Sequence, residues 1–165
     1  MDRQYDPGTD WRKDASSHLW SRWIESGFSG GLVISEHGQG DPLRVLLVED
    51  DPISQRVMAN LLKKIGIHAD VVGNGHEAIS VLQSRSYDVI FMDVQMPQMD
   101  GLQATKVIRD RWPCKSIRII ALTSCSLKGD RERCLLAGMD DYIAKPFKRE
   151  EIIEAIKRFA LKARV

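Results

Sequence analysis

Charged and hydroxyl side chains follow the short apolar runs of this sequence, at the point where each run ends. The ones that could do chemistry are Glu49, Asp50, Asp93, Thr123 and Lys145. Three carboxylates brought together in a partly desolvated cleft repel one another strongly, so such a cluster makes physical sense only with a cation to neutralise it. Carboxylate oxygens without histidine or thiolate ligands suit a hard ion, most simply Mg²⁺.

Phosphoryl transfer is the chemistry that such a set supports. The reaction needs an in-line nucleophile, with positive or hydrogen-bonding groups around the equatorial oxygens of the phosphoryl group. Asp93 would supply the nucleophilic carboxylate and form an acyl phosphate, while Mg²⁺ and Lys145 supply charge and Thr123 a hydroxyl donor. Taken singly, such residues more often cap helices, form turns or lie on solvated faces. All of these residues occur where a short apolar run ends, and this joint occurrence favours the catalytic interpretation.

The elements that position these residues follow a repeated strand–helix pattern from Leu43 onward. Short apolar runs alternate with amphipathic segments, which is typical of βα units and a parallel sheet. The expected strands span residues 43–48, 68–72, 87–92, 117–122 and 141–144. The expected helices span residues 52–65, 75–85, 101–112, 130–137 and 149–162. In the first helix one face is apolar and carries Ile53, Val57, Met58, Leu61, Leu62 and Ile65.

This pattern predicts an α/β protein with a five-stranded, doubly wound parallel sheet. The strands are nearly continuously apolar, which implies helices on both faces of the sheet. In such sheets the functional groups collect beyond the carboxyl ends of the strands, at the crevice where the strand order reverses. The five candidate residues would therefore converge on one edge.

The overall composition limits the classes of partner. The 165 residues include 24 basic and 23 acidic side chains, for a net charge of +1. This balance gives no electrostatic case for nucleic acid or an anionic membrane. The 3 cysteines, an odd number without a C-x-x-C spacing, support neither a disulfide framework nor a zinc site. With no apolar run long enough to span a membrane and no apolar leader, the chain is expected to be cytoplasmic.

The first 41 residues differ in composition from the rest, with half of the glycines and most of the tryptophans. We place a boundary near Asp41 and Pro42, which divides the chain into an N-terminal tail or linker, 1–41, and a folded domain, 42–165. Trp20, Trp23 and Ile24 lie at helical spacing. Two alternatives stay open for the tail: one short amphipathic helix around residues 15–26, or a mostly disordered segment, because a helix this short is marginal without packing.

Four motifs, in this order and spacing, resemble the receiver domain of response regulators and hybrid histidine kinases: LLVEDD, FMDVQMPQMDG, ALTS and AKPF. The resemblance covers about three quarters of the chain. It implies a flavodoxin-like sheet with strand order 2-1-3-4-5, Asp93 as the phosphoacceptor and Mg²⁺ as the cofactor. By the same likeness Asp50 binds Mg²⁺ directly, Glu49 binds it through water, and the main-chain carbonyl of Gln95 is the third protein ligand beside Asp93.

The resemblance also assigns a switch. Thr123 and Tyr142 match the pair that responds to phosphorylation, in which the hydroxyl moves toward the phosphoryl group and the aromatic ring turns inward. Lys145 followed by Pro146 is similar to the family's lysine with its cis-prolyl bond. Ser124 stands where the family more often has Ala, which bears on the lifetime of the phosphorylated form.

Three more residues near the site depart from or fit the family pattern. Asp51 stands where sensor-kinase receivers often have Asn, and it adds a charge at the edge of the site. Pro97 and Gly101 suit the turn after Asp93, where a fixed φ and a permissive residue shape the loop.

The function expected from this resemblance is a phosphorelay switch that catalyses only its own phosphorylation and dephosphorylation. The phosphoryl donor would be a phosphohistidine on a histidine kinase or a histidine phosphotransfer protein. Output would pass through the surface of the fourth helix, fifth strand and fifth helix to a downstream protein or to a second copy of the chain. Neither nucleic acid nor a membrane is expected as a partner.

Three competing functions fit less well. A phosphatase of the haloacid dehalogenase class wants a second acidic residue two positions after its nucleophile, where this chain has Gln95. A pseudo-receiver that only docks partners would typically lack the acceptor, the acidic pair or the lysine. A DNA-binding regulator would need a further module for which the chain has no room. Whether the chain is a complete protein, a passive phosphoryl shuttle or a receiver from a hybrid kinase stays open.

Overall fold

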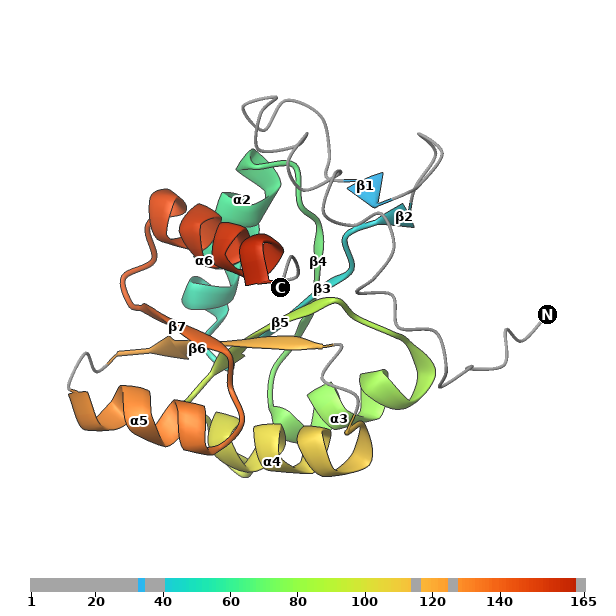
Figure 1. Cartoon of the computed structure of the whole chain (residues 1–165), viewed down its shortest axis with the longest axis vertical. Helices are drawn as coiled ribbons and strands as arrows, with labels where there is room; N and C mark the ends of the chain where they lie inside the picture. Colours follow the sequence, from blue (N-terminus) through green and yellow to red (C-terminus); the bar gives the residue numbers. More distant parts are fainter. Residues whose placement is uncertain (1–32, 35–40, 114–116, 125–127, 163–165) are drawn as a thin grey trace.

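A five-stranded parallel sheet lies at the centre of the protein (Figure 1), in a computed structural model that describes residues 33–34, 41–113, 117–124 and 128–162. The order across the sheet is β4-β3-β5-β6-β7, which is 2-1-3-4-5 when these strands are numbered along the chain. The doubly wound, flavodoxin-like prediction is therefore confirmed. The strands are β3 (Val45–Val48), β4 (Ala69–Val72), β5 (Val89–Asp93), β6 (Arg118–Thr123) and β7 (Asp141–Ala144).

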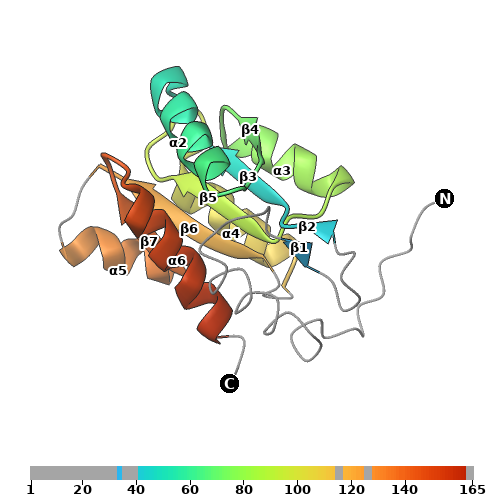
Figure 2. The ribbon, with the colours of Figure 1, turned by 90° about the horizontal axis from the view of Figure 1, so that it is seen from above.

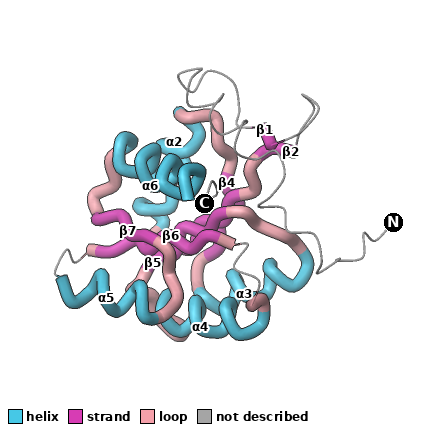
Figure 3. The backbone as a smooth tube through the Cα atoms, in the orientation of Figure 1, coloured by secondary structure: helices cyan, strands magenta, loops and turns pink. Residues whose placement is uncertain are grey.

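Helices cover both faces of this sheet, as the apolar strands predicted. Helices α2 and α6 lie on one face, and α3, α4 and α5 lie on the other (Figures 1, 2 and 3). The helices are α2 (Pro52–Lys64), α3 (Gly75–Ser84), α4 (Gly101–Arg111), α5 (Lys128–Leu136) and α6 (Arg149–Lys162). Among the described residues, no helix is both long enough and apolar enough to cross a membrane.

Local sequence signals set the helix ends. Asp51, Asn74 and Asp100 are the N-caps of α2, α3 and α4, and each side chain accepts the backbone N–H three residues further on. Such caps satisfy one of the donors that a helix start leaves without an intrahelical partner. Gly66 and Gly138 follow α2 and α5 with φ angles of 80° and 101°, a left-handed conformation that glycine adopts without steric cost.

Two apolar clusters, one on each face of the sheet, hold the layers together. Every residue of β3 and β5 is buried, and alternate side chains along these strands point to opposite faces. The cluster under α2 and α6 includes Leu47, Phe91, Met58, Leu62, Ile152 and Ile156. The cluster under α3, α4 and α5 includes Leu46, Ile90, Ile79, Ala104, Ile108 and Cys134. Because each fully buried aliphatic side chain contributes about 1.5–3 kcal/mol, these clusters fix where the strand ends lie.

The structure differs from the sequence-based prediction in how much of α2 is covered, and it contains two short strands that were not predicted. The face of α2 that packs on the protein carries Met58 and Leu62, whereas Ile53 and Val57, which share its apolar pattern, are 74% and 43% exposed. Two short strands, β1 (Val33–Ile34) and β2 (Asp41–Pro42), pair antiparallel ahead of the main sheet, which the sequence did not predict. The helix expected around residues 15–26 lies outside the described residues.

Candidate active site

Three carboxylates meet at the carboxyl edge of the sheet. Glu49 and Asp50 directly follow β3, and Asp93 is the last residue of the neighbouring strand β5. One oxygen from each of these three side chains lies within 4.8 Å of the other two. Glu49 and Asp93 are buried, with 0% and 3% of their surfaces exposed, while Asp50 is exposed. The parallel register thus brings together the carboxylates that the sequence placed at two strand ends.

Lys145 provides the one ammonium group of this cluster that the described residues show. It follows β7, and its Nζ lies 2.7 Å from Glu49 Oε2 and 3.2 Å from Asp93 Oδ2. The Lys145–Pro146 peptide bond is cis, as the resemblance implied. Burial by itself would lower the pKa of Lys145, but the hydrogen bond to Glu49 and the charge of Asp93 outweigh it and raise that pKa. Lys145 is therefore a permanent cation in the site.

The electrostatic balance of the cluster is negative. Burial and the neighbouring Glu49 raise the pKa of Asp93 to about 7, although Lys145 acts in the opposite direction. Burial is the largest cause of this upward shift in the pKa of Asp93 and the charge of Glu49 is the next, and the single ammonium group of Lys145 does not offset them. All of the clustered donors are carboxylate oxygens, the ligands that hard divalent cations such as Mg²⁺ prefer. The residues present therefore fit a metal ion of this kind.

Backbone and amide groups hold the carboxylates in place. The N–H of Asp51 donates to Glu49 Oε1 at 3.2 Å, and the N–H of Gln95 donates to Asp93 Oδ1 at 3.3 Å. Gln55 Nε2 donates to the carbonyl oxygen of Glu49 at 2.6 Å. The sequence analysis missed Gln55; its position one turn into the helix that Asp51 caps was the available signal. The contacts from Asp51 and Gln95 orient the two carboxylates, and the contact from Gln55 holds the backbone of Glu49.

Asp51 itself is a helix cap. Its Oδ2 accepts the N–H of Ser54 at 2.8 Å, and this hydrogen bond lowers the pKa of the Asp51 carboxyl. The negative charge expected at the edge of the site is therefore present, and it is held at the start of α2, where a helix dipole favours it.

Thr123 and Ser124 form the next side of the cleft. Thr123 is the last residue of β6, beside β5, and is 7% exposed. Ser124 Oγ donates to Gln95 Oε1 at 3.4 Å, which joins the end of β6 to the loop after Asp93. A cavity of about 390 Å³ opens next to Thr123 and is bordered by that loop and by α5. The effect of Ser124 on the lifetime of the phosphorylated form stays a prediction.

The turn after Asp93 needs glycine at position 101 because the backbone approaches closely there, and not because of an unusual φ angle. Gly101 begins α4, and its N–H donates to the carbonyl oxygen of Val94 at 3.0 Å. A Cβ at this position would collide with the backbone carbonyl of Asp93, so glycine is needed for a close approach. The left-handed residue of the turn is Gln98, with a φ of 68°.

Tyr142 lies apart from the carboxylate cluster. It is half-buried in β7, paired in register with Ala121 of β6, and its ring lies under the guanidinium of Arg131 from α5, 5.6 Å from the ring centroid. The remaining predicted site residues therefore meet at the edge of the sheet, while Tyr142 faces α5. Its movement on phosphorylation stays a prediction.

Comparison with known proteins identifies the family that this fold and site define. Residues 45–157 match the response regulator receiver domain, so the chain belongs to the response-regulator receiver family. It is 44% identical over 124 residues to hybrid signal transduction histidine kinase K of Dictyostelium discoideum, with 71% of this chain and 10% of that protein covered. Probable histidine kinase 1 of Oryza sativa subsp. indica is 37% identical over 147 residues, with 70% and 15% covered. The chain thus spans a small part of these curated relatives.

Solved structures of receiver domains resemble this one closely. The receiver domain of a sensor histidine kinase from Pseudomonas aeruginosa PAO1, with a magnesium ion coordinated in its active-site cleft, is 42% identical, with a TM-score of 0.66 over 72% of this chain and 97% of that one. The receiver domain of the Saccharomyces cerevisiae response regulator Ssk1, co-crystallised with the histidine phosphotransfer protein Ypd1, is 30% identical. Its TM-score is 0.67 over 72% of this chain and 89% of that one.

Proposed function

We propose that the protein is a phosphorelay receiver in which Asp93 accepts a phosphoryl group from a phosphohistidine, in a reaction that requires Mg²⁺. The observation that carries this proposal is the cluster itself: a buried carboxylate, two further carboxylates within 4.8 Å and an ammonium group 3.2 Å away. The magnesium ion in the cleft of the related Pseudomonas receiver supports the same cofactor here.

Each residue then has one task in the transfer. An oxygen of Asp93 attacks the phosphorus, the bond from phosphorus to the donor's imidazole nitrogen breaks, and an acyl phosphate forms. Lys145 and the hydroxyl of Thr123 stabilise the charge on the equatorial oxygens. Glu49, Asp50 and the carbonyl oxygen of Gln95 would hold Mg²⁺. When bound, this ion supplies positive charge that neutralises the phosphoryl oxygens and the carboxylates.

Intact mass spectrometry tests this proposal. The full chain is incubated with acetyl phosphate, with Mg²⁺ or with a chelator, as wild type, Asp93→Ala and the matched control Asp88→Ala, an aspartate at the opposite end of β5. We expect the mass of one phosphoryl group to be gained by the wild type and Asp88→Ala with Mg²⁺, and no gain for Asp93→Ala. Labelling of Asp93→Ala, or equal labelling in the chelator, would contradict the proposal.

We propose the exposed part of α2 as the docking surface for the phosphodonor. Ile53 and Val57 are 74% and 43% exposed on the helix that begins next to the acidic pair, and exposed apolar groups at a site rim suit a protein contact. A histidine kinase or histidine phosphotransfer protein would place its phosphohistidine over Asp93 from there. The co-crystal structure of the related Ssk1 receiver with the histidine phosphotransfer protein Ypd1 supports a partner of this class.

The variant Ile53→Asp separates docking from chemistry. We expect it to slow transfer from a phosphorylated histidine phosphotransfer protein at least about tenfold, because charge replaces an apolar contact, while labelling by acetyl phosphate stays at the wild-type rate. Leu136→Asp, at the 86% exposed Leu136 of α5, is the control and should leave both rates unchanged. Loss of labelling by both donors would mean that Ile53 supports the site and not a partner.

Output would pass through the surface of α5, β7 and α6, where a groove of about 820 Å³ runs between the two helices. Its lining carries both signs of charge, including Arg118, Arg131, Glu151 and Arg158, which suits a downstream protein or a second copy of the chain. In this proposal residues 42–165 are the receiver, residues 1–41 a tail or linker, and the protein is a cytoplasmic phosphoprotein that acts as a signalling domain and modifies no substrate other than itself.

A further inference from the structure

Gln55 joins helix α2 to the loop that carries the acidic pair. Its Nε2 donates to the carbonyl oxygen of Glu49 at 2.6 Å, a short distance for an N–H···O hydrogen bond. The side chain of Gln55 is half-buried, and its backbone N–H donates to the carbonyl oxygen of Asp51 at 2.9 Å. Gln55 therefore bonds to the residue before Asp50 and to the residue after it.

Asp50 lies between two peptide groups that are both held by side chains. The carbonyl of Glu49 and the N–H of Asp50 belong to one planar peptide group, so the hydrogen bond from Gln55 fixes the plane before Asp50. The N–H of Asp51 donates to Glu49 Oε1 at 3.2 Å, which fixes the plane after it. Because these two planes set the φ and ψ angles of Asp50, they also set the direction in which its side chain leaves the backbone.

The Asp50 carboxylate has no contact of its own that orients it. It is exposed, and within the described parts of the chain no group forms a hydrogen bond or ion pair with it. By contrast, Lys145 Nζ lies 2.7 Å from Glu49 Oε2 and 3.2 Å from Asp93 Oδ2. The buried carboxylates therefore have a side-chain partner without any metal ion, whereas the position of the Asp50 oxygens depends on the backbone.

Magnesium binding is sensitive to this direction. Mg²⁺ requires near-ideal octahedral geometry, with ligand oxygens at about 2.0–2.1 Å. Groups that orient a metal ligand without touching the metal typically change the affinity about 10- to 100-fold. One oxygen of Asp50 lies within 4.8 Å of an oxygen of Glu49 and of an oxygen of Asp93. A rotation of the peptide plane before Asp50 would move its oxygen relative to the other two.

We infer that Gln55 is a positioning residue for the metal ligand Asp50: its amide holds the preceding peptide plane and thereby sets the affinity for Mg²⁺ without contacting the ion. This inference deepens the proposed function, on which it rests for the role of Asp50 as a ligand. Gln55 is uncharged, so its effect on the affinity comes from geometry and not from the charge balance of the cluster. A change at Glu49, Asp93 or Lys145 would alter both.

Titration of the full chain with Mg²⁺, followed by NMR spectroscopy, tests this role. Two variants, Gln55→Met and Gln55→Ala, both lack the amide donor but differ in the volume of the side chain. The matched control is Gln83→Met, at an exposed glutamine of α3 on the opposite face of the sheet (Figure 1). Each change is made in the wild-type chain and in Asp50→Ala, which completes a double-mutant cycle.

We expect Gln55→Met and Gln55→Ala each to weaken Mg²⁺ binding about tenfold, because both release the same peptide plane. Gln83→Met should bind Mg²⁺ like the wild type. In Asp50→Ala the two changes at Gln55 should alter the affinity less than about twofold, since the side chain that Gln55 positions is gone. An equal loss of affinity with and without the Asp50 carboxylate would overturn the inference, as would wild-type affinity in Gln55→Met.

Spectra recorded in a chelator supply a second readout that needs no metal. In Gln55→Met the carbonyl ¹³C shift of Glu49 should change, because this carbonyl loses its hydrogen bond, and the Asp50 amide should be more mobile than in the wild type. Gln83→Met should leave both unchanged. If Asp50→Ala binds too little Mg²⁺ to complete the cycle, these spectra decide: an Asp50 amide that is as ordered in Gln55→Met as in the wild type overturns the inference.

The titration also separates this inference from the proposed function. A chain with the expected Mg²⁺ affinities that takes up no phosphoryl group from acetyl phosphate would support the role of Gln55 and contradict phosphorylation at Asp93. A chain that is labelled at Asp93 with Mg²⁺, but in which Gln55→Met keeps the wild-type affinity, would leave the proposed function standing and overturn this inference.

Discussion

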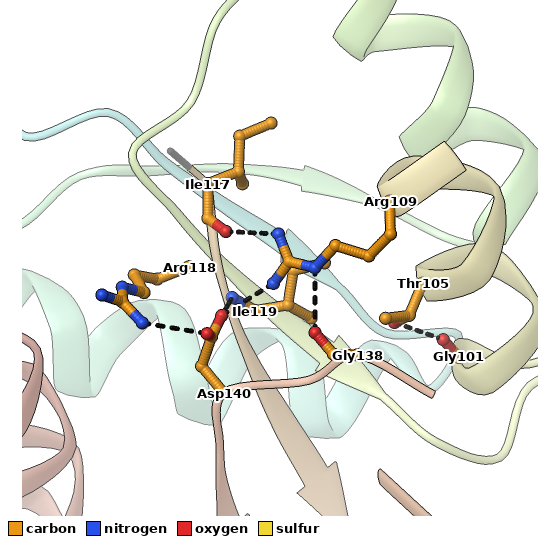
Figure 4. A network of polar contacts seen from close by, with 8 residues as sticks. All are labelled: Gly101, Thr105, Arg109, Ile117, Arg118, Ile119, Gly138 and Asp140. Carbon is orange, nitrogen blue, oxygen red and sulfur yellow. Dashed lines mark hydrogen bonds and ion pairs between the residues drawn. The ribbon is translucent and has the colours of Figure 1, made fainter. Parts of the chain in front are cut away.

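The two ends of the parallel sheet each carry charged side chains, and among the described residues those at the carboxyl ends are left with an excess of negative charge. At the amino ends of the strands, each described carboxylate meets a guanidinium. The pairs are Asp88 with Arg44, Asp140 with Arg109 and Arg118 (Figure 4), Asp141 with Arg158, and Asp70 with Arg85. At the carboxyl ends, three carboxylates share the ammonium of Lys145. A cluster that its own chain neutralises holds the fold, whereas a cluster left negative can hold a cation and, with it, a phosphoryl group.

The largest difference between the two ends should appear on removal of Mg²⁺. A chelator should abolish labelling by acetyl phosphate, because the negative cluster then repels the donor's phosphoryl oxygens.

Asp50→Asn should weaken Mg²⁺ binding at least about tenfold, since it removes one charged ligand. Titration calorimetry with Mg²⁺ measures this affinity, with Asp88→Asn as the control. Unchanged affinity in Asp50→Asn would place the ion elsewhere.

Loss of the cation at the carboxyl end should cost stability in a way that Mg²⁺ repairs. Lys145→Met leaves Glu49, which is 0% exposed, without its partner. We expect a loss of about 3 kcal/mol in the free energy of unfolding in a chelator. In saturating Mg²⁺ the gap to the wild type should narrow, because the ion takes over the neutralisation. Urea denaturation in the chelator and in Mg²⁺ measures the two free energies of unfolding. A loss of the same size under both conditions would contradict the role assigned to charge.

Loss of a cation at the amino end should show no such rescue. Arg109→Met removes the hydrogen bonds that Arg109 donates to Gly138, Ile117 and Asp140. Asp140 still has its ion pair with Arg118, and its side chain is 24% exposed. We expect a loss of about 2 kcal/mol, equal with and without Mg²⁺, from the same urea measurements. Labelling of Asp93 by acetyl phosphate should be retained. If Mg²⁺ removed this loss of stability, the two clusters would be energetically coupled, which would contradict the difference proposed between them.

Deletion of residues 1–41 should have the smallest effect. The ion clusters at both ends of the sheet lie within residues 42–165, so the truncated chain should take up the phosphoryl group at the wild-type rate. Intact mass after timed incubation with acetyl phosphate compares the two. A truncated chain that folds by circular dichroism but takes up no label would show that the deleted segment contributes to the site.

The carboxyl-end cluster could be predicted from the sequence for a physical reason. In a parallel sheet all strands end at one edge, so apolar runs followed by Glu49, Asp93 and Lys145 suffice to bring these side chains together. The helix layers follow from the same alternation of elements, whereas the order of the strands was implied by the resemblance to receiver domains. The helix caps Asp51, Asn74 and Asp100 were not predicted, although Asp and Asn at helix starts act through near neighbours in the sequence.

The amino-end cluster and the exposed part of α2 could not be predicted this way. Arg109 meets Gly138 across 29 residues of sequence, and no periodicity links positions so far apart. The helical period identified an apolar stripe on α2, but how much of it is covered depends on α6 and the sheet beneath. These cover Met58 and Leu62 and leave Ile53 in solvent.

The most direct test of the central claim is to locate the phosphoryl group on the chain. After labelling with acetyl phosphate and Mg²⁺, borohydride reduces an acyl phosphate of aspartate to homoserine, and peptide mass spectrometry identifies the residue. We predict homoserine at position 93 and an unchanged aspartate at positions 50, 88 and 140. Reduction at another aspartate, with Asp93 intact, would contradict the assignment of the carboxyl-end cluster as the phosphoryl-transfer site.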